Sequence, residues 1–318
     1  MNYLTIQVGR YAGQPLDDSS RRSIQLQSQS ERQAASIEPG IPCAVVSNFY
    51  HAGEFWIASI PLDAVRSVYA QSFNFSKPKT RRGPDGPEIL YDSRGIPLRS
   101  VSGLNHIQSR FMVREDRPVE LFRPDDRSRT QPVHSITDFI YSLEAVGPVG
   151  VHFNFRDALS GNLFSAHRFL STQEMVFERI SVENQYVMET PPLPLDGAQQ
   201  RGVLVGSLLR SHKAGSNERY YLYRYCGTNN CTSNPLQIVD GVVNYSLARR
   251  FGALLYRLPL NPRLYLRIRG LDTDPTVRNL VREEFELYLA DPATRQRKRD
   301  HVRRKTREIR AMRAESRG

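Results

Sequence analysis

The apolar residues of this 318-residue chain are gathered in short runs. None of these runs approaches the roughly 18–20 consecutive apolar residues that cross a bilayer. Residues 41–49 and 54–62 are rich in β-branched and aromatic side chains and flank a turn-like segment, a pattern that predicts a β-hairpin. The N-terminus lacks the basic start and apolar core of an export signal. We therefore expect a chain that neither spans a membrane nor carries a secretory signal.

Strand-like and helix-like patterns alternate through the rest of the chain, which predicts an α+β fold with a mixed sheet. Strands are expected at 106–113 and 117–122, paired as a second hairpin, and at 149–155, 174–180 and 220–225. Helices are expected over 135–146, over 196–212, after Asn234-Pro235 and after Asp274-Pro275. Four prolines and three glycines interrupt residues 76–100, which predicts an exposed loop there.

Charge and composition divide the chain into three parts. Residues 1–40 are expected to form a flexible polar leader, since 15–40 have almost no large apolar residue to bury. Residues 41–270 are expected to form one α+β domain, and 271–318 a helix with an Arg-rich tail. Residues 295–318 hold eleven basic and three acidic residues of a chain with net charge +11. The basic balance therefore belongs mainly to this tail, and the activity of the body must be inferred separately.

Three cysteines, at positions 43, 226 and 231, are too few for a disulfide scaffold and lack the spacing of a zinc site. We expect neither a metal nor another cofactor. Cys231 lies where an aromatic segment, 220–225, gives way to the helix that follows Pro235. A thiol near a helix N-terminus is favoured as thiolate by unpaired backbone amides and the helix dipole. Cys231 is therefore the candidate nucleophile, and it would need a histidine base from elsewhere in the chain.

Residues 104–270, about half of the chain, resemble the Lnb N-terminal periplasmic domain family. The resemblance rests on His106 and Ser109 at the start of a strand, on Glu120 after Pro118-Val119, and on the segment Asn230-Cys231-Thr232-Ser233. Ser233 replaces a threonine of the family pattern, and the interval from His106 to Glu120 is a few residues shorter than the family pattern.

The resemblance implies a permuted papain-like domain (NlpC/P60-like) that carries out acyl transfer or hydrolysis through a thioester, on lipid or lipoprotein substrates. It implies Cys231 as nucleophile, His106 as base and Glu120 as the group that orients the imidazole. Asn230, Thr232 and Ser109 would then line the binding site, and backbone amides near Cys231 would stabilise the oxyanion. A periplasmic or membrane-associated location is also implied by the family.

Alternatives to this site remain open. Cys231 could be a buried structural cysteine, a common state for a free thiol, or could pair with Cys226 in a disulfide. His51 and His152 are rival bases, and His106 and Glu120 could be ordinary residues at strand ends.

A second hypothesis makes the protein a non-catalytic binding or scaffold protein that docks on an anionic membrane surface. Its docking element would be the basic tail, and basic residues near a charged bilayer each contribute about 1 kcal/mol. Nucleic acid is a less favoured partner because the tail lacks interleaved aromatic residues for stacking. The tail residues assigned to the membrane surface are Arg297, Lys298, Arg299, Arg303, Arg304 and Lys305.

Overall fold

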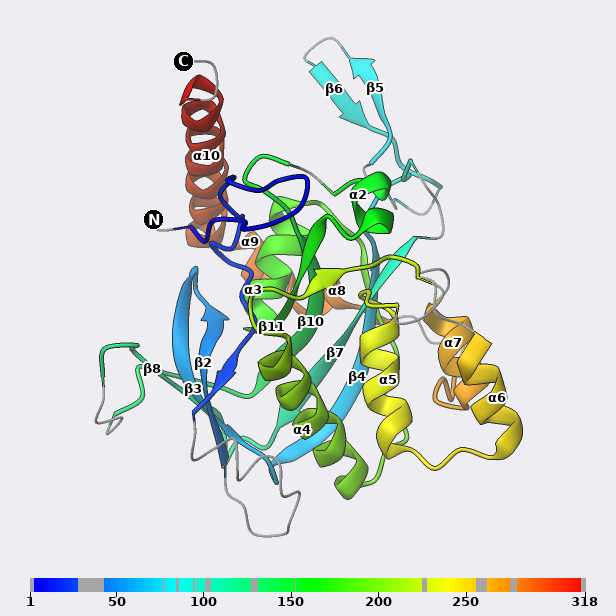
Figure 1. Cartoon of the computed structure of the whole chain (residues 1–318). Helices are drawn as coiled ribbons and strands as arrows, with labels where there is room; N and C mark the ends of the chain where they lie inside the picture. The colour runs from blue at the N-terminus through cyan, green and yellow to red at the C-terminus, as the bar shows by residue number, and fades with distance from the viewer. Residues whose placement is uncertain are drawn as a thin grey trace.

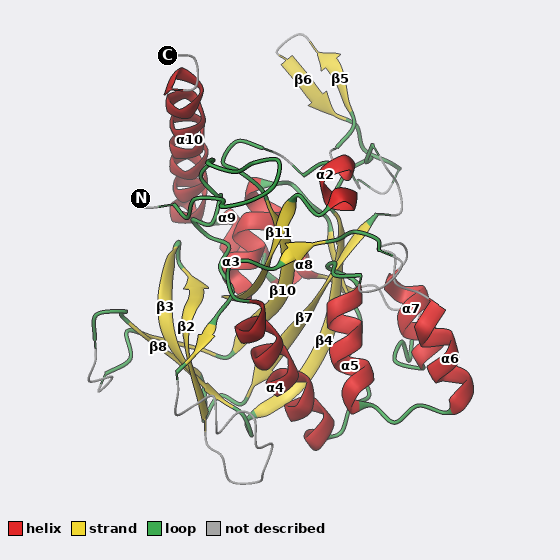
Figure 2. Cartoon of the chain, in the orientation of Figure 1, coloured by secondary structure: helices red, strands yellow, loops and turns green. Residues whose placement is uncertain are grey.

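The computed structural model (Figures 1 and 2) describes residues 3–315 except 28–42, 77, 84–85, 94, 96, 101–103, 127–130, 152, 225–227, 256–261 and 275–278. Its centre is one large mixed sheet in the order β14-β12-β4-β7-β10-β11-β2-β3-β8-β9, with β1 paired to β2 and β13 to β11. The contact between β11 and β2 is parallel, and the other pairs are antiparallel. The fold is therefore α+β with a mixed sheet, as the sequence predicts.

The strands of this sheet differ widely in length. The long ones are β2 (Cys43–His51), β3 (Glu54–Pro61), β4 (Val65–Asn74), β7 (Asn105–Val113), β10 (Asp138–Val146) and β11 (Leu163–Ser171). The short ones are β1 (Gln25–Leu26), β8 (Val119–Phe122), β9 (His134–Ile136), β12 (Val187–Glu189), β13 (Arg219–Tyr220) and β14 (Asn279–Leu280). A separate hairpin, β5 (Thr80–Gly83) and β6 (Gly86–Ile89), projects from the body (Figure 1).

Helices cover both faces of the sheet. One face packs against α4 (Gly197–Ala214), α5 (Ser233–Val242) and α7 (Pro262–Arg269), whose apolar residues join the largest core cluster; α6 (Leu247–Leu255) lies on α7. The other face packs against α3 (Thr172–Val176), the π-helical turn η1 (Phe177–Val182), α8 (Val281–Glu284) and α9 (Glu286–Ala290). The remaining helices are α2 (Phe155–Ser160) and α10 (Pro292–Glu315).

The prediction of a helix over 135–146 is wrong, because these residues form β9 and β10. Strand β10 is buried on both faces, so its apolar residues do not alternate cleanly with polar ones. Its Glu144 is buried and bonds to Arg168 (2.9 Å) and Arg179 (2.6 Å) from the neighbouring strand and η1. A half-exposed strand would alternate apolar residues with polar residues that face solvent. In β10 the polar residue Glu144 is instead buried and neutralised by ion pairs.

The segment over residues 15–27 is not a flexible leader. Leu16, Ile24 and Leu26 are buried, and β1 pairs with β2. Three apolar anchors are enough here because each enters an existing cluster, so the low apolar content of the segment was misleading. The remainder of the predicted leader, 28–40, lies outside the described residues.

The hairpin of β2 and β3 confirms its prediction, whereas β7 and β8 do not pair with each other. Strand β7 joins β4 and β10, and β8 joins β3 and β9. The expected loop 76–100 contains the β5–β6 hairpin, whose strands carry prolines only at edge positions.

Two further strand predictions are wrong, since the described residues of 149–155 form a turn and irregular chain that leads into α2, and 174–180 lies in α3 and η1. In 220–225 the described residues continue as a strand only at Tyr220. The helices α4 and α5 are confirmed. A capping box of Asp196 and Gln199 begins α4. Residues 271–290 belong to the body rather than to a tail, because β14 extends the sheet and α8 and α9 pack on it.

Candidate functional site

The turn that leads into α5 is built around the side chain of Asn230. Its Oδ1 accepts hydrogen bonds from the backbone amides of Thr232 (2.9 Å) and Ser233 (2.7 Å), and its Nδ2 donates to the carbonyl of Leu222 (2.7 Å). The Ser233 hydroxyl in turn accepts from the Asn230 amide (3.1 Å). The segment that carries the family resemblance therefore acts as a cap that satisfies the first amides of a helix.

This cap engages two amides close to Cys231 that could otherwise stabilise an oxyanion. A transition-state oxyanion requires donors that are free to point at the reacting atom. The amides of Thr232 and Ser233 already share one acceptor inside the protein. Helix-start amides beside Cys231 are thus engaged in the fold itself.

The thiol of Cys231 is a free thiol, buried at 2% exposure. The hydroxyl of Tyr220 lies 3.8 Å from its Sγ, and a backbone hydrogen bond from Ile107 also reaches it. Burial dominates over these donors and raises the pKa of Cys231 to about 11. A helix-terminal position does not activate the thiol here, because desolvation outweighs the helix dipole.

The imidazole of His106 lies on the opposite face of β7 from Ile107. It stacks on Phe73 with ring centroids 4.6 Å apart, and its Nε2 hydrogen-bonds to the Ser142 hydroxyl at 2.8 Å. Phe73 belongs to the core under α3 and η1, whereas Ile107 belongs to the core under α4 and α5. Since successive strand residues point to opposite faces, His106 turns away from the face that carries Cys231. Burial, and then the charge of Arg179, lowers the pKa of His106 to about 3.

Glu120 lies in another part of the sheet. Its strand, β8, is separated from β7 by β10, β11, β2 and β3, and Glu120 pairs there with Ser59 and Ser135. Ser109 is buried in β7 on the α4 and α5 face, two residues from Ile107. The structure therefore does not bring the proposed nucleophile, base and orienting acid together, because alternation and strand order separate them.

The alternatives are resolved only in part. His51 is buried, and its Nδ1 bonds to the Ser171 hydroxyl at 2.8 Å; burial and then His134 lower its pKa to about 4. It lies on β2, five positions along the sheet order from β12 and away from the α5 turn. His152 and Cys226 lie outside the described residues.

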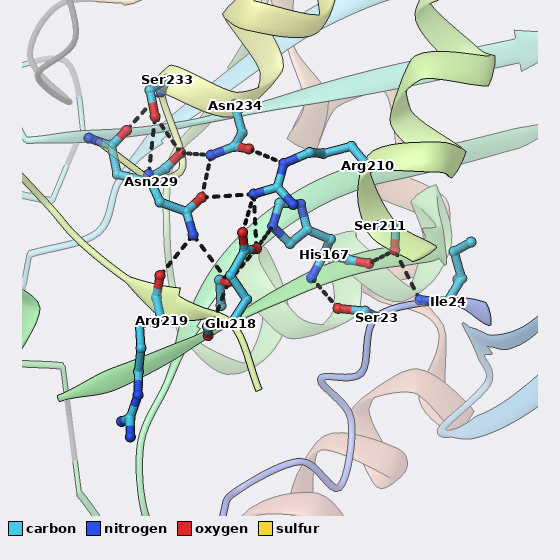
Figure 3. A network of polar contacts seen from close by, with 12 residues as sticks. Ser23, Ile24, His167, Arg210, Ser211, Glu218, Arg219, Asn229, Ser233 and Asn234 are labelled. Atoms are coloured by element: carbon cyan, nitrogen blue, oxygen red, sulfur yellow. Dashed lines mark hydrogen bonds and ion pairs between the residues drawn. The ribbon is translucent and has the colours of Figure 1, made fainter. Parts of the chain in front are cut away.

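A buried histidine that the sequence did not single out, His167, lies beside the α5 turn (Figure 3). Its Nε2 bonds to Glu218 (3.1 Å), and its Nδ1 to the hydroxyl of Tyr141 (2.8 Å). Glu218 also accepts a hydrogen bond from Arg210 (2.7 Å), and Arg210 donates another to the side chain of Asn234 (2.8 Å). The network thus ties β11 and α4 to the turn before α5.

The same network fixes the N-terminal segment. The His167 amide donates to the Ser23 hydroxyl (3.1 Å), and the Ile24 amide donates to the Ser211 hydroxyl (3.0 Å; Figure 3). Burial lowers the pKa of His167 to about 4, and bonds from His167 and Arg210 bring that of Glu218 to about 2 despite burial. A neutral imidazole with both nitrogens bonded holds the fold together. No sequence spacing marks it, because its partners come from four separate segments.

Within the described ranges, no three His, Cys, Asp or Glu side chains converge as metal ligands. None of the helices in the described part of the chain is both long and apolar enough to cross a membrane.

Helix α10 has two different faces. The inner face holds Arg297, which bonds to Glu174 (2.8 Å) and lies 3.9 Å from the ring centre of Phe177, and Lys305, which pairs with Asp17 at 3.0 Å. His301 contacts the edge of Phe177 on the same side. These contacts fix α10 on α3, η1 and the N-terminal segment.

The outer face of α10 carries five exposed arginines at intervals of four, four, four and three residues. Because each helical residue turns about 100°, this spacing keeps them on one side, opposite Arg297, His301 and Lys305. We call this set the arginine stripe: Arg295, Arg299, Arg303, Arg307 and Arg310. Figure 1 shows α10 upright at one edge of the molecule, with its C-terminal half extending beyond the sheet.

The predicted tail site shares only two residues with the arginine stripe. Arg299 and Arg303 belong to it, while Arg304 is exposed beside it and Lys298 is half-buried. Arg297 and Lys305 are turned to the body and are engaged in ion pairs. Three members, Arg295, Arg307 and Arg310, were missing from the prediction, although helical spacing in the sequence could have identified them.

Comparisons with protein-family models, with curated proteins and with solved structures give no match to this chain.

Proposed function

We propose that this protein is a non-catalytic binding protein that docks on anionic membrane surfaces through α10, its basic C-terminal extension. The observation that carries the proposal is the arginine stripe on the face of α10 opposite its contacts with the body. A face that is exposed in the described part of the chain and carries five guanidinium groups is suited to a negatively charged partner.

A flat surface fits the stripe better than a pocketed one. Fifteen residues separate Arg295 from Arg310, which places the stripe along about 22 Å of a straight helix. All five side chains can meet one plane, since the helix lies between that plane and the contacts with the body. A basic residue near an anionic bilayer contributes about 1 kcal/mol, so the stripe supplies an affinity of useful size without inserting apolar residues.

The acyl-transfer hypothesis has weaker support. It would require a thiolate at Cys231, an imidazole beside it and free amides for the oxyanion. The pKa of Cys231 is raised by burial, His106 bonds to Ser142, and Asn230 holds the nearest amides. The permuted papain-like arrangement and the lipid or lipoprotein substrate stay predictions of the family resemblance, and they add nothing to the membrane proposal.

The test is sedimentation of the full chain with vesicles of phosphatidylcholine, with and without 30% phosphatidylserine, at low and high salt. The test variant replaces Arg299, Arg303 and Arg307 by Gln. A matched control removes the same charge from three exposed arginines elsewhere, Arg66, Arg82 and Arg156.

We expect the wild type and the control to bind phosphatidylserine vesicles at 0.1 M salt and to bind them more weakly at 0.5 M. The stripe variant should bind on the order of 100-fold more weakly, as about 1 kcal/mol per arginine predicts. Equal binding by stripe variant and control would overturn the proposal. Stripe-dependent binding to a 30-base-pair DNA duplex, without binding to vesicles, would replace the membrane by nucleic acid.

A further inference from the structure

Helix α6 exposes the apolar side chains that a surface helix normally buries. Leu247 and Phe251, one turn apart, are 85% and 68% exposed. Arg249, on another side of the helix, lies over Gly270 at the end of α7, where an added Cβ would meet its guanidinium at 2.5 Å. An amphipathic helix of a soluble protein turns its apolar face inward. In α6 an arginine lies against the neighbouring helix, while leucine and phenylalanine face solvent.

This exposed face is held on a firmly anchored support. In α7, Tyr265 and Leu266 are buried in the main core, and Arg269 bonds to Asp240 of α5 at 2.7 and 2.8 Å. The outward residues of α7 include Leu264 (44% exposed) and the exposed Arg267. Because α6 packs on α7, the position of Leu247 and Phe251 is set by the fold rather than by a loose end.

The charge around this face has one sign. Residues 241–271 contain six arginines and no acidic residue. Arg269 and Arg263 are paired with Asp240 and Asp272, which lie just outside the segment. Arg250, next to Phe251 in the chain, is exposed, and Arg267 is exposed with its Nε 3.6 Å from a carboxylate oxygen of Asp272. Exposed leucine and phenylalanine with a cationic border match a bilayer, where headgroup phosphates lie above the acyl chains.

We infer that α6 and α7 form a second membrane contact, in which the face of Leu247, Phe251 and Leu264 inserts into the boundary between headgroups and acyl chains. Arg250 pairs with headgroup phosphates. This contact goes beyond the α10 proposal, because it depends on apolar burial and persists where salt screens the stripe.

The test places a fluorescent reporter on α6 in the full chain. The only tryptophan, Trp56, is 3% exposed and supplies a constant background. Phe251→Trp adds a reporter on the proposed face, and Leu287→Trp, on α9 at a residue 89% exposed, is the matched control. Both are mixed with phosphatidylcholine–phosphatidylserine vesicles containing acyl-brominated lipid, which quenches a tryptophan that reaches the acyl region.

We expect Phe251→Trp to shift to the blue and to be quenched, with Leu287→Trp unchanged. The double variant Leu247→Gln, Phe251→Gln should bind at least tenfold more weakly at 0.5 M salt, where the stripe variant binds like wild type. Absence of quenching in Phe251→Trp, while the vesicles still sediment the protein, would overturn the α6 contact and leave the α10 proposal intact. A concentration-dependent blue shift without vesicles would assign this face to self-association instead.

Discussion

The polar groups inside this protein differ from those on its surface in how completely other groups of the chain bind them. Inside, both ring nitrogens of His167 are bonded, and His106 bonds to Ser142. Outside, the arginine stripe faces solvent along the length of α10. Cys231, His106 and His167 are here buried in the fold, whereas the stripe arginines are exposed, and Arg299 and Arg303 contact only Gln296 and Asp300 of their own helix among the described residues.

The buried histidines should make the stability of the folded protein strongly sensitive to acid. The pKa values of His51, His106 and His167 are lowered from 6.5 to about 4, 3 and 4, mainly by burial. These neutral imidazoles contribute to stability above pH 6.5. The contribution is lost as pH falls, because the three histidines bind protons in the unfolded chain but stay neutral in the folded one. Between pH 6.5 and 4.5 each imidazole should cost about 1.4 kcal/mol per pH unit.

Urea unfolding at pH 7.0, 5.5 and 4.5 measures this dependence. His106→Gln should reduce the slope by the share of one imidazole, about 1.4 kcal/mol per pH unit. Measurements at pH 4.5 and above avoid the titration of Glu218. Its contribution to stability is present above its ordinary pKa and is lost as pH falls from there to about 2. An unchanged slope in His106→Gln would show that this imidazole is accessible to protons in the folded protein.

Reversing the charge of the exposed arginine stripe should abolish its attraction to anionic vesicles. Replacing Arg299, Arg303 and Arg307 by Glu converts attraction to repulsion, so affinity for phosphatidylserine vesicles at 0.1 M salt should fall on the order of 1,000-fold. Vesicle sedimentation measures it, and circular dichroism checks that α10 stays helical. A loss no larger than that of the Arg66, Arg82 and Arg156 control would remove the distinction between the stripe and any exposed arginine.

The two faces of α10 bring the comparison into one helix. Arg297→Met leaves the buried carboxylate of Glu174 without its partner, so unfolding free energy should fall by about 2 kcal/mol. Arg299→Met, two residues away on the outer face, should change it by less than about 0.5 kcal/mol. Thermal or urea unfolding of both variants measures the difference. Equal effects would mean that α10 packs on the body differently.

The smallest effect is expected at Cys231. With its pKa raised to about 11 and its side chain buried, Cys231 should react with iodoacetamide only as the protein unfolds. Cys231→Ala should cost about 1 kcal/mol of stability and leave vesicle binding unchanged. Peptide mapping by mass spectrometry measures labelling at each position. Labelling of native Cys231 faster than that of Cys43 would revive the nucleophile hypothesis.

The sequence predicts well those elements that are determined by interactions between neighbouring residues. The capping box of α4, the start of α5 and the β2–β3 hairpin are all encoded within a few residues. The pairing partners of β7 and β8 are set by contacts far along the chain, so a hairpin between them was a natural but wrong inference. The prediction of a helix at β10 was wrong because the polar residues Ser142 and Glu144 are buried there, by partners whose positions the sequence does not show.

For the candidate site, the sequence located the α5 turn correctly but not its role. Asn230 and Cys231 do lie at a strand-to-helix connection, yet only coordinates show that the Asn230 side chain closes on Thr232 and Ser233. The alternation of β7 could have warned that His106 and Ile107 face opposite sides. Helical spacing groups the residues of α10 into faces, but which face is turned inward depends on Glu174 and Asp17, which lie far along the chain.

The pairing of β14 with β12 determines where the chain can be shortened. Met188 and Glu189 bond to Leu280 and Asn279, so a truncation after residue 270 would strip the outermost strand and leave β12 as an open edge. Open edges of this kind recruit strands from other molecules and cause aggregation. A version without α10 should therefore end near Asp291, which keeps β14, α8 and α9 and lets loss of docking be distinguished from loss of solubility.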